Sequence, residues 1–208
     1  TQRVALGFTW MIILSFVIVA TLLIGNITAV FQRSVKRMLS YSSIAQAGFM
    51  LFALYGNSIF NTEALLLYIV AYSLATIGIF AVLIKMKDYS FESFNGLAKQ
   101  NPALAFLTTV FLFSLAGIPL TAGFFAKYYM LNALLTAGAG LWLLIAAVVF
   151  AAVSVYYYFK LVQAMYFTPG EPAINEVGKP YEMKLWIIAA LIFILGVFPS
   201  FLFNYLYF

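Results

Sequence analysis

The chain has 208 residues, of which 65% are hydrophobic and 8% are charged, and its formal net charge is +5. A soluble domain averages about 25% charged residues, so this sequence has too little polar surface to cover a water-facing globule. This excludes a soluble enzyme, a nucleic-acid-binding module and a disordered segment. Cysteine and histidine are absent from the sequence, so this chain alone cannot supply a disulfide, an iron–sulfur cluster, a histidine-ligated haem or a Cys/His zinc site.

Six apolar runs long enough to cross a bilayer follow one another along the chain. A spanning helix needs about 20 mostly apolar residues. The runs that approach or exceed this length are Trp10–Gln32, Met38–Tyr55, Glu63–Ile84, Ala103–Leu135, Leu141–Phe167 and Lys184–Phe208. The sequence therefore predicts an all-α polytopic membrane protein with one membrane domain over residues 1–208. Because residues 1–9 resemble a loop and do not begin with Met, we expect this chain to be the C-terminal part of a larger protein. The missing N-terminal part of that protein would then be one of its partners.

Basic residues are concentrated on one side of the predicted bundle. With six alternating spans, Arg3 alone falls on one side. Nine basic residues fall on the other: Arg33, Lys36, Arg37, Lys85, Lys87, Lys99, Lys160, Lys179 and Lys184. Cytoplasmic loops carry the excess of Lys and Arg, so both ends of this segment are predicted on the periplasmic side of a bacterial inner membrane. Trp10, Trp142 and Trp186 lie near run ends, as is typical of residues at the membrane interface.

The fourth run is too long for one straight helix across the membrane. Its 33 residues would extend about 50 Å at about 1.5 Å per residue, whereas the hydrocarbon core is about 30 Å thick. Gly117 and Pro119 interrupt it, because proline lacks an N–H and its ring clashes with the carbonyl four residues earlier. We predict a discontinuous helix, with one half ending near Ala116 and the second beginning near Leu120. Such helices build ion sites in transporters; an ordinary proline kink is the alternative.

Lys127 is the eleventh basic residue, which the count of the two sides leaves out, and it falls in the interior of the fourth predicted span. A lysine at the bilayer centre costs about 2.5–3.5 kcal/mol on insertion scales, and such residues usually face the protein interior or a water cavity and mark ion pathways. On the broken-helix interpretation it lies about two turns into the second half. An amine in this place can bind and release a proton, so the sequence predicts a proton-relay site. The alternative is a lysine that snorkels to the membrane interface.

Polar side chains in the second and third runs have two interpretations. Ser42 and Gln46 are four residues apart and share a helix face, and Tyr72 lies midway along the third run. Such groups can hold a file of water between titratable sites, or they can form interhelical hydrogen bonds of about 0.6 kcal/mol each. Lys36 lies at the start of the second run. It is a candidate for the proton path, and contact with lipid headgroups would explain a basic residue there equally well. Glu63 is an acid at a span boundary, and we expect it at the membrane interface.

Two long motifs carry a resemblance to a known family. The first is Val35-Lys-Arg-Met-Leu-Ser-Tyr-Ser-Ser-Ile-Ala-Gln-Ala-Gly48. About 80 residues later comes Phe113-Ser-Leu-Ala-Gly-Ile-Pro-Leu-Thr-Ala-Gly-Phe-Phe-Ala-Lys-Tyr-Tyr129, and Tyr156-Tyr-Tyr-Phe-Lys160 follows. Together they resemble the antiporter-like subunits of proton-pumping NADH:quinone oxidoreductase (respiratory complex I), and most closely the N subunits. The resemblance covers essentially the whole chain.

The resemblance implies a fold and a function. The fold would be built from two inverted five-helix repeats, each with a broken helix, and this chain would hold the second repeat plus the last helix. The function would be proton translocation, in which Lys127 matches the lysine of the broken helix, on the periplasmic-side proton path. Lys36 matches a basic position at the start of the second span, and Tyr72 matches a position that lines the central water path. The chain itself would bind no cofactor, and NADH, FMN, iron–sulfur clusters and quinone would bind to other subunits. Its partners would be these other membrane subunits and the lipid bilayer.

The sequence departs from the family at Gln46, where many members carry a histidine. Glutamine does not titrate, so it would act only through hydrogen-bonded water. The family's first repeat is also missing, so this segment would supply half of a pathway. Homologous subunits of multisubunit sodium/proton antiporters or membrane-bound hydrogenases share the fold and the lysine and are the nearest alternatives. A structural membrane anchor without a transport role is an alternative of another class, and it would tolerate any replacement of Lys127.

Overall fold

The computed structural model describes residues 2–55 and 59–202, and the side chains of residues 9–55 and 60–202. The described residues form helices and the turns between them. The helices are α1 (Gln2–Val30), α2 (Val35–Met50), α3 (Ile59–Lys85), α4 (Leu97–Gln100), α5 (Pro102–Ala116), α6 (Ala122–Thr136), α7 (Leu141–Phe167) and α8 (Lys179–Val197). Short 3-10 turns follow α2 (Leu51–Tyr55) and precede α4 (Glu92–Phe94).

The predicted all-α membrane fold is confirmed. Five helices are long and apolar enough to cross a membrane, namely α1, α2 with its 3-10 turn, α3, α7 and α8, and α5 is a shorter apolar helix. Residues 1–9 were expected as a loop, but helix α1 already begins at Gln2, because the mostly apolar residues 4–8 extend the first apolar run toward the start of the chain. The last helix begins at Lys179 and ends at Val197, where Pro199 disfavours continuation; residues 203–208 of the predicted run lie outside the described part.

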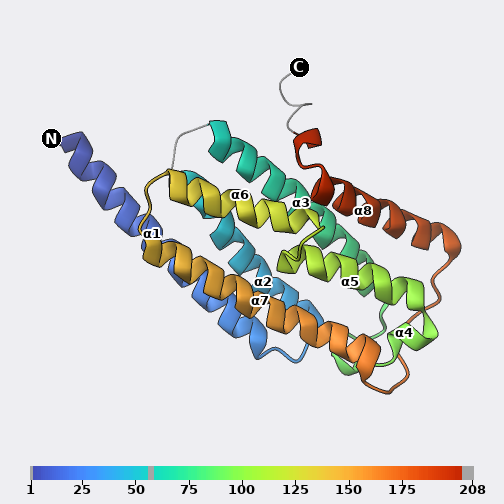
Figure 1. Cartoon of the computed structure of the whole chain (residues 1–208). Helices are drawn as coiled ribbons and strands as arrows, with labels where there is room; N and C mark the ends of the chain where they lie inside the picture. Colours follow the sequence, from blue (N-terminus) through green and yellow to red (C-terminus); the bar gives the residue numbers. More distant parts are fainter. Residues whose placement is uncertain (1, 56–58, 203–208) are drawn as a thin grey trace.

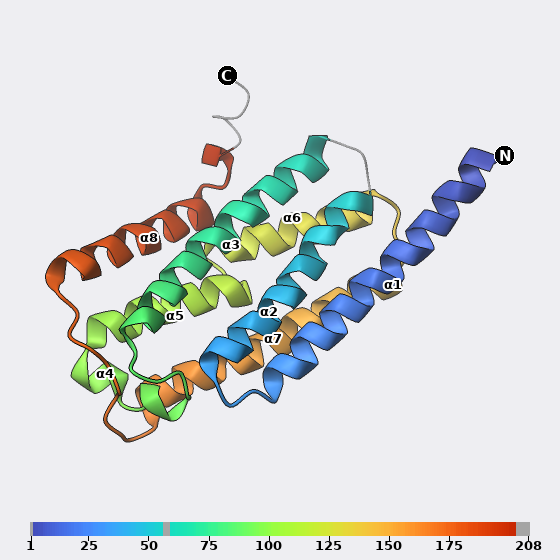
Figure 2. The ribbon, with the colours of Figure 1, turned by 180° about the vertical axis from the view of Figure 1, so that it is seen from behind.

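The helices lie side by side in a bundle (Figure 1). Figures 1 and 2 show α1, α2 and α7 along one side, α8 at the opposite edge, and α3, α5 and α6 between them. The close approach of α1 and α2 depends on Gly25. A Cβ there would lie 2.6 Å from the Ala45 nitrogen and 3.0 Å from the Tyr41 carbonyl oxygen.

Three connections meet at one end of this bundle, which we call the basic end: residues 31–34, 86–101 and 168–178. Isolated backbone bridges join Ser34 to Ser90 and Met86 to Ile174, so these connections hold one another together (Figure 1). They lie at the same end because the chain crosses the bundle an even number of times between one connection and the next: along α2 and α3, and then along the α5–α6 pair and α7. The basic residues of these connections, separated in the sequence, therefore gather at one end, as the charge pattern predicts.

Aromatic rings support the lysine side chains at the basic end. Ammonium–ring contacts of this kind are worth about 0.5–1 kcal/mol at exposed sites. The distances from Nζ to ring centroid are 5.1 Å for Lys36 over Tyr89, 4.5 Å for Lys85 over Tyr181 and 4.7 Å for Lys160 over Phe91. Each pair joins two segments that are distant in the sequence, so each adds to the packing of this end.

A carboxylate organises the connection between α3 and α4. Oδ2 of Asp88 accepts hydrogen bonds from the Ser90 hydroxyl at 2.5 Å, the Ser93 hydroxyl at 2.9 Å and the Ser90 N–H at 3.2 Å. The hydroxyls of Ser90 and Ser93 favour the ionised form and lower the pKa of Asp88 to about 2. The turn over residues 88–93 is thus held by a charged acceptor.

Candidate functional site

The fourth apolar run is divided in two, which confirms the predicted discontinuous helix (Figure 1). Helix α5 ends at Ala116, and Gly117 follows in the left-handed conformation with φ of 82°. Pro119 lies in the link between the helices. Leu120 also has a positive φ, 73°, which no right-handed helix can include, so α6 begins at Ala122 and not at Leu120 as the sequence suggested.

Glycines allow the two half-helices and α8 to approach the break closely. A Cβ on Gly123, in the first turn of α6, would overlap the carbonyl oxygen of Ser114 in α5. A Cβ on Gly196 of α8 would lie 2.5 Å from the carbonyl carbon of Thr121. Both positions require glycine for lack of space, since the contacted atoms belong to the backbone.

The end of α5 satisfies part of its own hydrogen bonding. The last four carbonyls of a helix have no partner within the helix. The N–H of Ile118 donates to Phe113 O at 2.9 Å, and the N–H of Gly117 donates to Ser114 O at 3.1 Å. This pair of bonds is the Schellman motif that glycine at this position favours. It leaves the last two carbonyl groups of α5 to be satisfied by other parts of the chain.

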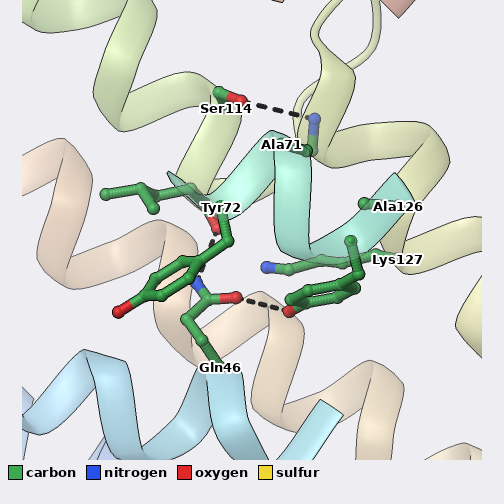
Figure 3. A pocket seen from close by; sticks show the side chains of 9 residues that line it. Gln46, Ala71, Tyr72, Ser114, Ala126 and Lys127 are labelled. Atoms are coloured by element: carbon green, nitrogen blue, oxygen red, sulfur yellow. Dashed lines mark hydrogen bonds between the residues drawn. The ribbon is translucent and has the colours of Figure 1, made fainter. Parts of the chain in front are cut away.

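Side chains predicted to be functional bind those two carbonyls. Nε2 of Gln46, on α2, donates to Leu115 O at 3.0 Å. Nζ of Lys127, on α6, donates to Ala116 O at 2.8 Å. Figure 3 shows both side chains converging on the same small space between the helices. Two residues that are 81 positions apart in the sequence therefore complete one helix end.

Lys127 lies in the protein interior. Its side chain is only 7% exposed, and it points toward the break. Besides the Ala116 carbonyl, its Nζ contacts the Ser154 hydroxyl of α7 at 3.4 Å and lies 5.2 Å from the ring centroid of Phe49. An ammonium group at this position faces the carboxyl end of α5, where the helix dipole favours positive charge.

Gln46 is the centre of a polar cluster that joins three helices. Its Nε2 contacts the hydroxyl of Tyr158, on α7, at 3.3 Å, and its Oε1 accepts a hydrogen bond from Tyr68, on α3. The Tyr158 hydroxyl donates to Oγ of Ser42 at 3.0 Å. Ser42 and Gln46 thus make interhelical hydrogen bonds, one of the two interpretations that the sequence left open. All four side chains are buried.

Two cavities lie on either side of Tyr72. One has a volume of about 10 Å³, room for about one water molecule, and Gln46, Tyr68, Ser114 and Lys127 are among the residues that line it. The other has a volume of about 170 Å³, and its polar lining comes from Ser40, Ser42, Ser43, Tyr72 and Thr76. Tyr72 and Leu115 border both cavities. Both cavities are large enough for water, and residues of α2 and α3 line them.

The structure does not bring Lys36 into this cluster. Lys36 is exposed in the first turn of α2, ten residues before Gln46, which corresponds to about 15 Å along a helix. Its ammonium group lies over Tyr89 at the basic end. Glu63 is partly exposed near the start of α3, a position consistent with a span boundary.

Tyr68 of this cluster and Ser154 beside Lys127 were not singled out from the sequence, and Tyr158 was noted only within the motif over residues 156–160. A signal for them exists. Ser154 and Tyr158 are four residues apart on α7, and Tyr68 and Tyr72 are four apart on α3, the spacing that places Ser42 and Gln46 on one face of α2. The same test applied to every apolar run would have identified the faces that turn inward.

The chain is similar to known membrane proteins over most of its length. The family model described as "NADH:quinone oxidoreductase/Mrp antiporter, TM" matches residues 3–154. The protein from Herpetosiphon aurantiacus named NADH-quinone oxidoreductase subunit N 2 is 39% identical over 202 residues, which is 95% of this chain and 37% of that protein. The chain thus spans about two fifths of the length of such curated relatives.

Solved structures show the same architecture. A chain of respiratory complex I from Thermus thermophilus with bound aureothin superposes with a TM-score of 0.78 at 34% identity, over 90% of this chain and 43% of that one. A chain of the Mrp complex from Dietzia sp. superposes with a TM-score of 0.83 at 18% identity, over 93% of this chain and 45% of that one. The second likeness is one of fold alone.

Proposed function

The chain belongs to the NADH:quinone oxidoreductase/Mrp antiporter transmembrane family, and from this premise we propose that it serves as a proton-translocating, non-redox membrane subunit of NADH:quinone oxidoreductase. It would couple electron transfer from NADH to quinone to proton pumping, as a subunit of that translocase. Curated relatives named for subunit N support this assignment over a sodium/proton antiporter or a hydrogenase. The assignment concerns the whole subunit, of which residues 2–202 contribute the helices described above.

The buried lysine at the helix break carries the proposal. An intramembrane lysine is costly and rare unless it serves an ion pathway, and discontinuous helices commonly hold ion sites at the midplane. Lys127 combines both features, with its Nζ on the Ala116 carbonyl and a water-sized cavity beside it. In the proposed mechanism, its amine accepts a proton from water in that cavity and later releases it.

Tyr72, Ser42 and Gln46 would position water between Lys127 and the basic end. Tyr72 borders both cavities, and Ser42 lines the larger one. Gln46 lines the smaller one and would order water by hydrogen bonding, since glutamine does not titrate. Lys36, which lies apart from the cluster, would act where the path opens at the basic end.

Redox chemistry would take place in partner subunits. The sequence contains neither cysteine nor histidine, the usual ligands of iron–sulfur clusters and haem, which is consistent with NADH, FMN, iron–sulfur clusters and quinone binding elsewhere in the complex. We place the subunit in a bacterial inner membrane. The nine basic residues toward the basic end argue that this end faces the cytoplasm, with residues 2 and 202 toward the periplasm.

The test is NADH-driven proton pumping by the assembled complex in inverted membrane vesicles, with NADH:quinone turnover measured in the same vesicles. Wild-type vesicles must show both activities. Lys127→Ala is expected to lose pumping, alone or together with turnover. The matched control is Lys160→Ala, a lysine on spanning helix α7 that is exposed at the basic end, and it should retain both.

A normally assembled Lys127→Ala complex with unchanged pumping would remove Lys127 from the proton path. It would favour a structural membrane anchor without a transport role. Failure of the chain to co-purify with NADH dehydrogenase activity would instead favour an antiporter or hydrogenase subunit.

A further inference from the structure

Every carbonyl group in the last turn of α5 is bound by an N–H donor. Gly117 and Ile118 supply two donors, and Gln46 and Lys127 supply the others. In transporters, carbonyl groups at the end of a broken half-helix coordinate sodium ions or protons. A metal cation that enters this break therefore finds each of these carbonyl oxygens already bound by a donor, with which it must compete.

The amide nitrogen of Gln46 lies against two oxygens from other helices, and a third oxygen lies one hydrogen bond further away. Leu115 O lies 3.0 Å away and the Tyr158 hydroxyl 3.3 Å away, and Ser42 Oγ lies 3.0 Å from that hydroxyl. These oxygens come from α5, α7 and α2. The adjoining cavity of about 10 Å³ has room for about one water molecule, and so for a small cation in its place.

The amide group fills this place without attracting a cation. Its N–H₂ group donates to the Leu115 carbonyl and the Tyr158 hydroxyl, and its only acceptor atom, Oε1, receives the Tyr68 hydroxyl. The ammonium group of Lys127, bound to the next carbonyl along α5, adds like-charge repulsion. A proton does not need a set of oxygen ligands, since a single lone pair on an amine, a hydroxyl or a water molecule is sufficient to bind it.

We propose that Gln46 makes the helix break selective for protons over sodium ions. Its amide group donates hydrogen bonds to the oxygens that a sodium ion would need as ligands. This inference rests on the proposed function, in which ions reach Lys127 through the neighbouring cavity. It assigns to Gln46 a role in ion specificity that is separate from ordering water.

Two substitutions of similar size separate the effects of the amide group. Gln46→Glu replaces the donor by an acidic oxygen, so that the carboxylate, the Leu115 carbonyl and the Tyr158 hydroxyl form a set of cation ligands. Gln46→Met uncovers the Leu115 carbonyl but adds no oxygen. The matched control is Thr108→Val, which removes a buried hydroxyl that donates to Leu104 O within α5 itself, at 2.7 Å.

The experiment measures NADH-driven proton uptake by inverted vesicles that contain the assembled complex with the full subunit. Sodium chloride replaces potassium chloride stepwise at constant ionic strength, and uptake of radioactive sodium is followed in parallel. We expect sodium to inhibit Gln46→Glu at an about tenfold lower concentration than wild type, a factor equal to about 1.4 kcal/mol of binding free energy. Gln46→Met should lie between them, and Thr108→Val should match wild type.

The inference is overturned if neither Gln46→Glu nor Gln46→Met becomes more sensitive to sodium than wild type. If Gln46→Glu does not assemble, Gln46→Met decides the question, because it is uncharged and similar in volume. The proposed function fails in a different way: wild-type vesicles would show no sodium-independent proton uptake with NADH, or Lys127→Ala would pump as wild type does.

Discussion

Lysine ammonium groups occupy two contrasting environments in this protein. At the basic end, Lys36 and Lys160 are exposed and lie over aromatic rings. At the break, Lys127 is buried, and its ammonium group is bound to a backbone carbonyl and a serine hydroxyl. Exposed lysines keep most of their hydration, whereas Lys127 exchanges water for the polar end of a helix. The comparison teaches that position relative to a helix end, and not charge alone, determines what a lysine contributes.

The largest expected effect comes from closing the space at the break. Gly123→Ala introduces a Cβ that overlaps the Ser114 carbonyl oxygen, and overpacking of this kind costs about 1–3 kcal/mol, occasionally more. We expect little assembled complex on native gels. In contrast, Gly178→Ala at the basic end places its Cβ 3.7 Å from Pro180, an ordinary contact, and should assemble normally. Equal assembly of the two variants would show that the break relaxes as easily as the basic end.

The lysines themselves should differ in their effect on stability. Lys127→Met leaves the Ala116 carbonyl without its donor, and an unsatisfied buried acceptor costs about 1–3 kcal/mol. Lys160→Met forfeits an exposed ammonium–ring contact, worth about 0.5–1 kcal/mol. Thermal unfolding of the purified complex, followed by release of this subunit, measures both. A larger loss for Lys160→Met would reverse the comparison.

Neighbouring tyrosines of α7 offer a finer contrast. Tyr158 is 1% exposed and its hydroxyl joins Ser42 to Gln46, whereas Tyr156 is 63% exposed. Tyr158→Phe should cost about 1 kcal/mol of stability and slow pumping in the proposed mechanism, while Tyr156→Phe should leave both unchanged. Matched pumping rates and unfolding temperatures for the two variants would count against the polar cluster.

The smallest effect concerns the pH response of the basic end. Hydrogen bonds from Ser90 and Ser93 lower the pKa of Asp88 to about 2, below the ordinary aspartate value of about 3.9. Since the folded-state pKa is the lower one, this stabilisation is fully present above about pH 5 and is lost as the pH falls toward about 2. Amide hydrogen exchange over residues 88–93 should accelerate in that range beyond its intrinsic pH dependence. In Asp88→Asn this extra acceleration should be absent; its persistence would assign the effect to another group.

Much of the fold follows from local properties of the sequence. Apolar runs of bundle length predicted the spanning helices, and Gly117 and Pro119 marked the break because their backbone preferences are intrinsic. Lys127 was conspicuous because a charged side chain contradicts its apolar surroundings. The start of α6 was less predictable, because Leu120 adopts a left-handed conformation that its own chemistry disfavours. The link lies close against Gly196 of α8, a tertiary contact that the local sequence does not reveal.

The partners within the site depended on tertiary structure. That Gln46 binds the Leu115 carbonyl, and that Tyr158 reaches Ser42, requires three helices to meet at one level of the bundle. Nothing in the local sequence fixes that level. Lys36 illustrates the opposite case, since its similarity to a basic family position suggested a place in the path, and the side chain lies at the basic end. Its participation in proton transfer stays a prediction.

The last turn of α5 also has a mechanical consequence. Its final two carbonyls are held by side chains from different helices, Gln46 of α2 and Lys127 of α6, and adjacent residues are fixed about 3.8 Å apart along the chain. These two carbonyls belong to adjacent peptide groups, so a single turn of α5 links α2 to α6 through side-chain hydrogen bonds. A displacement of either helix along the bundle axis would have to stretch or break one of these two bonds.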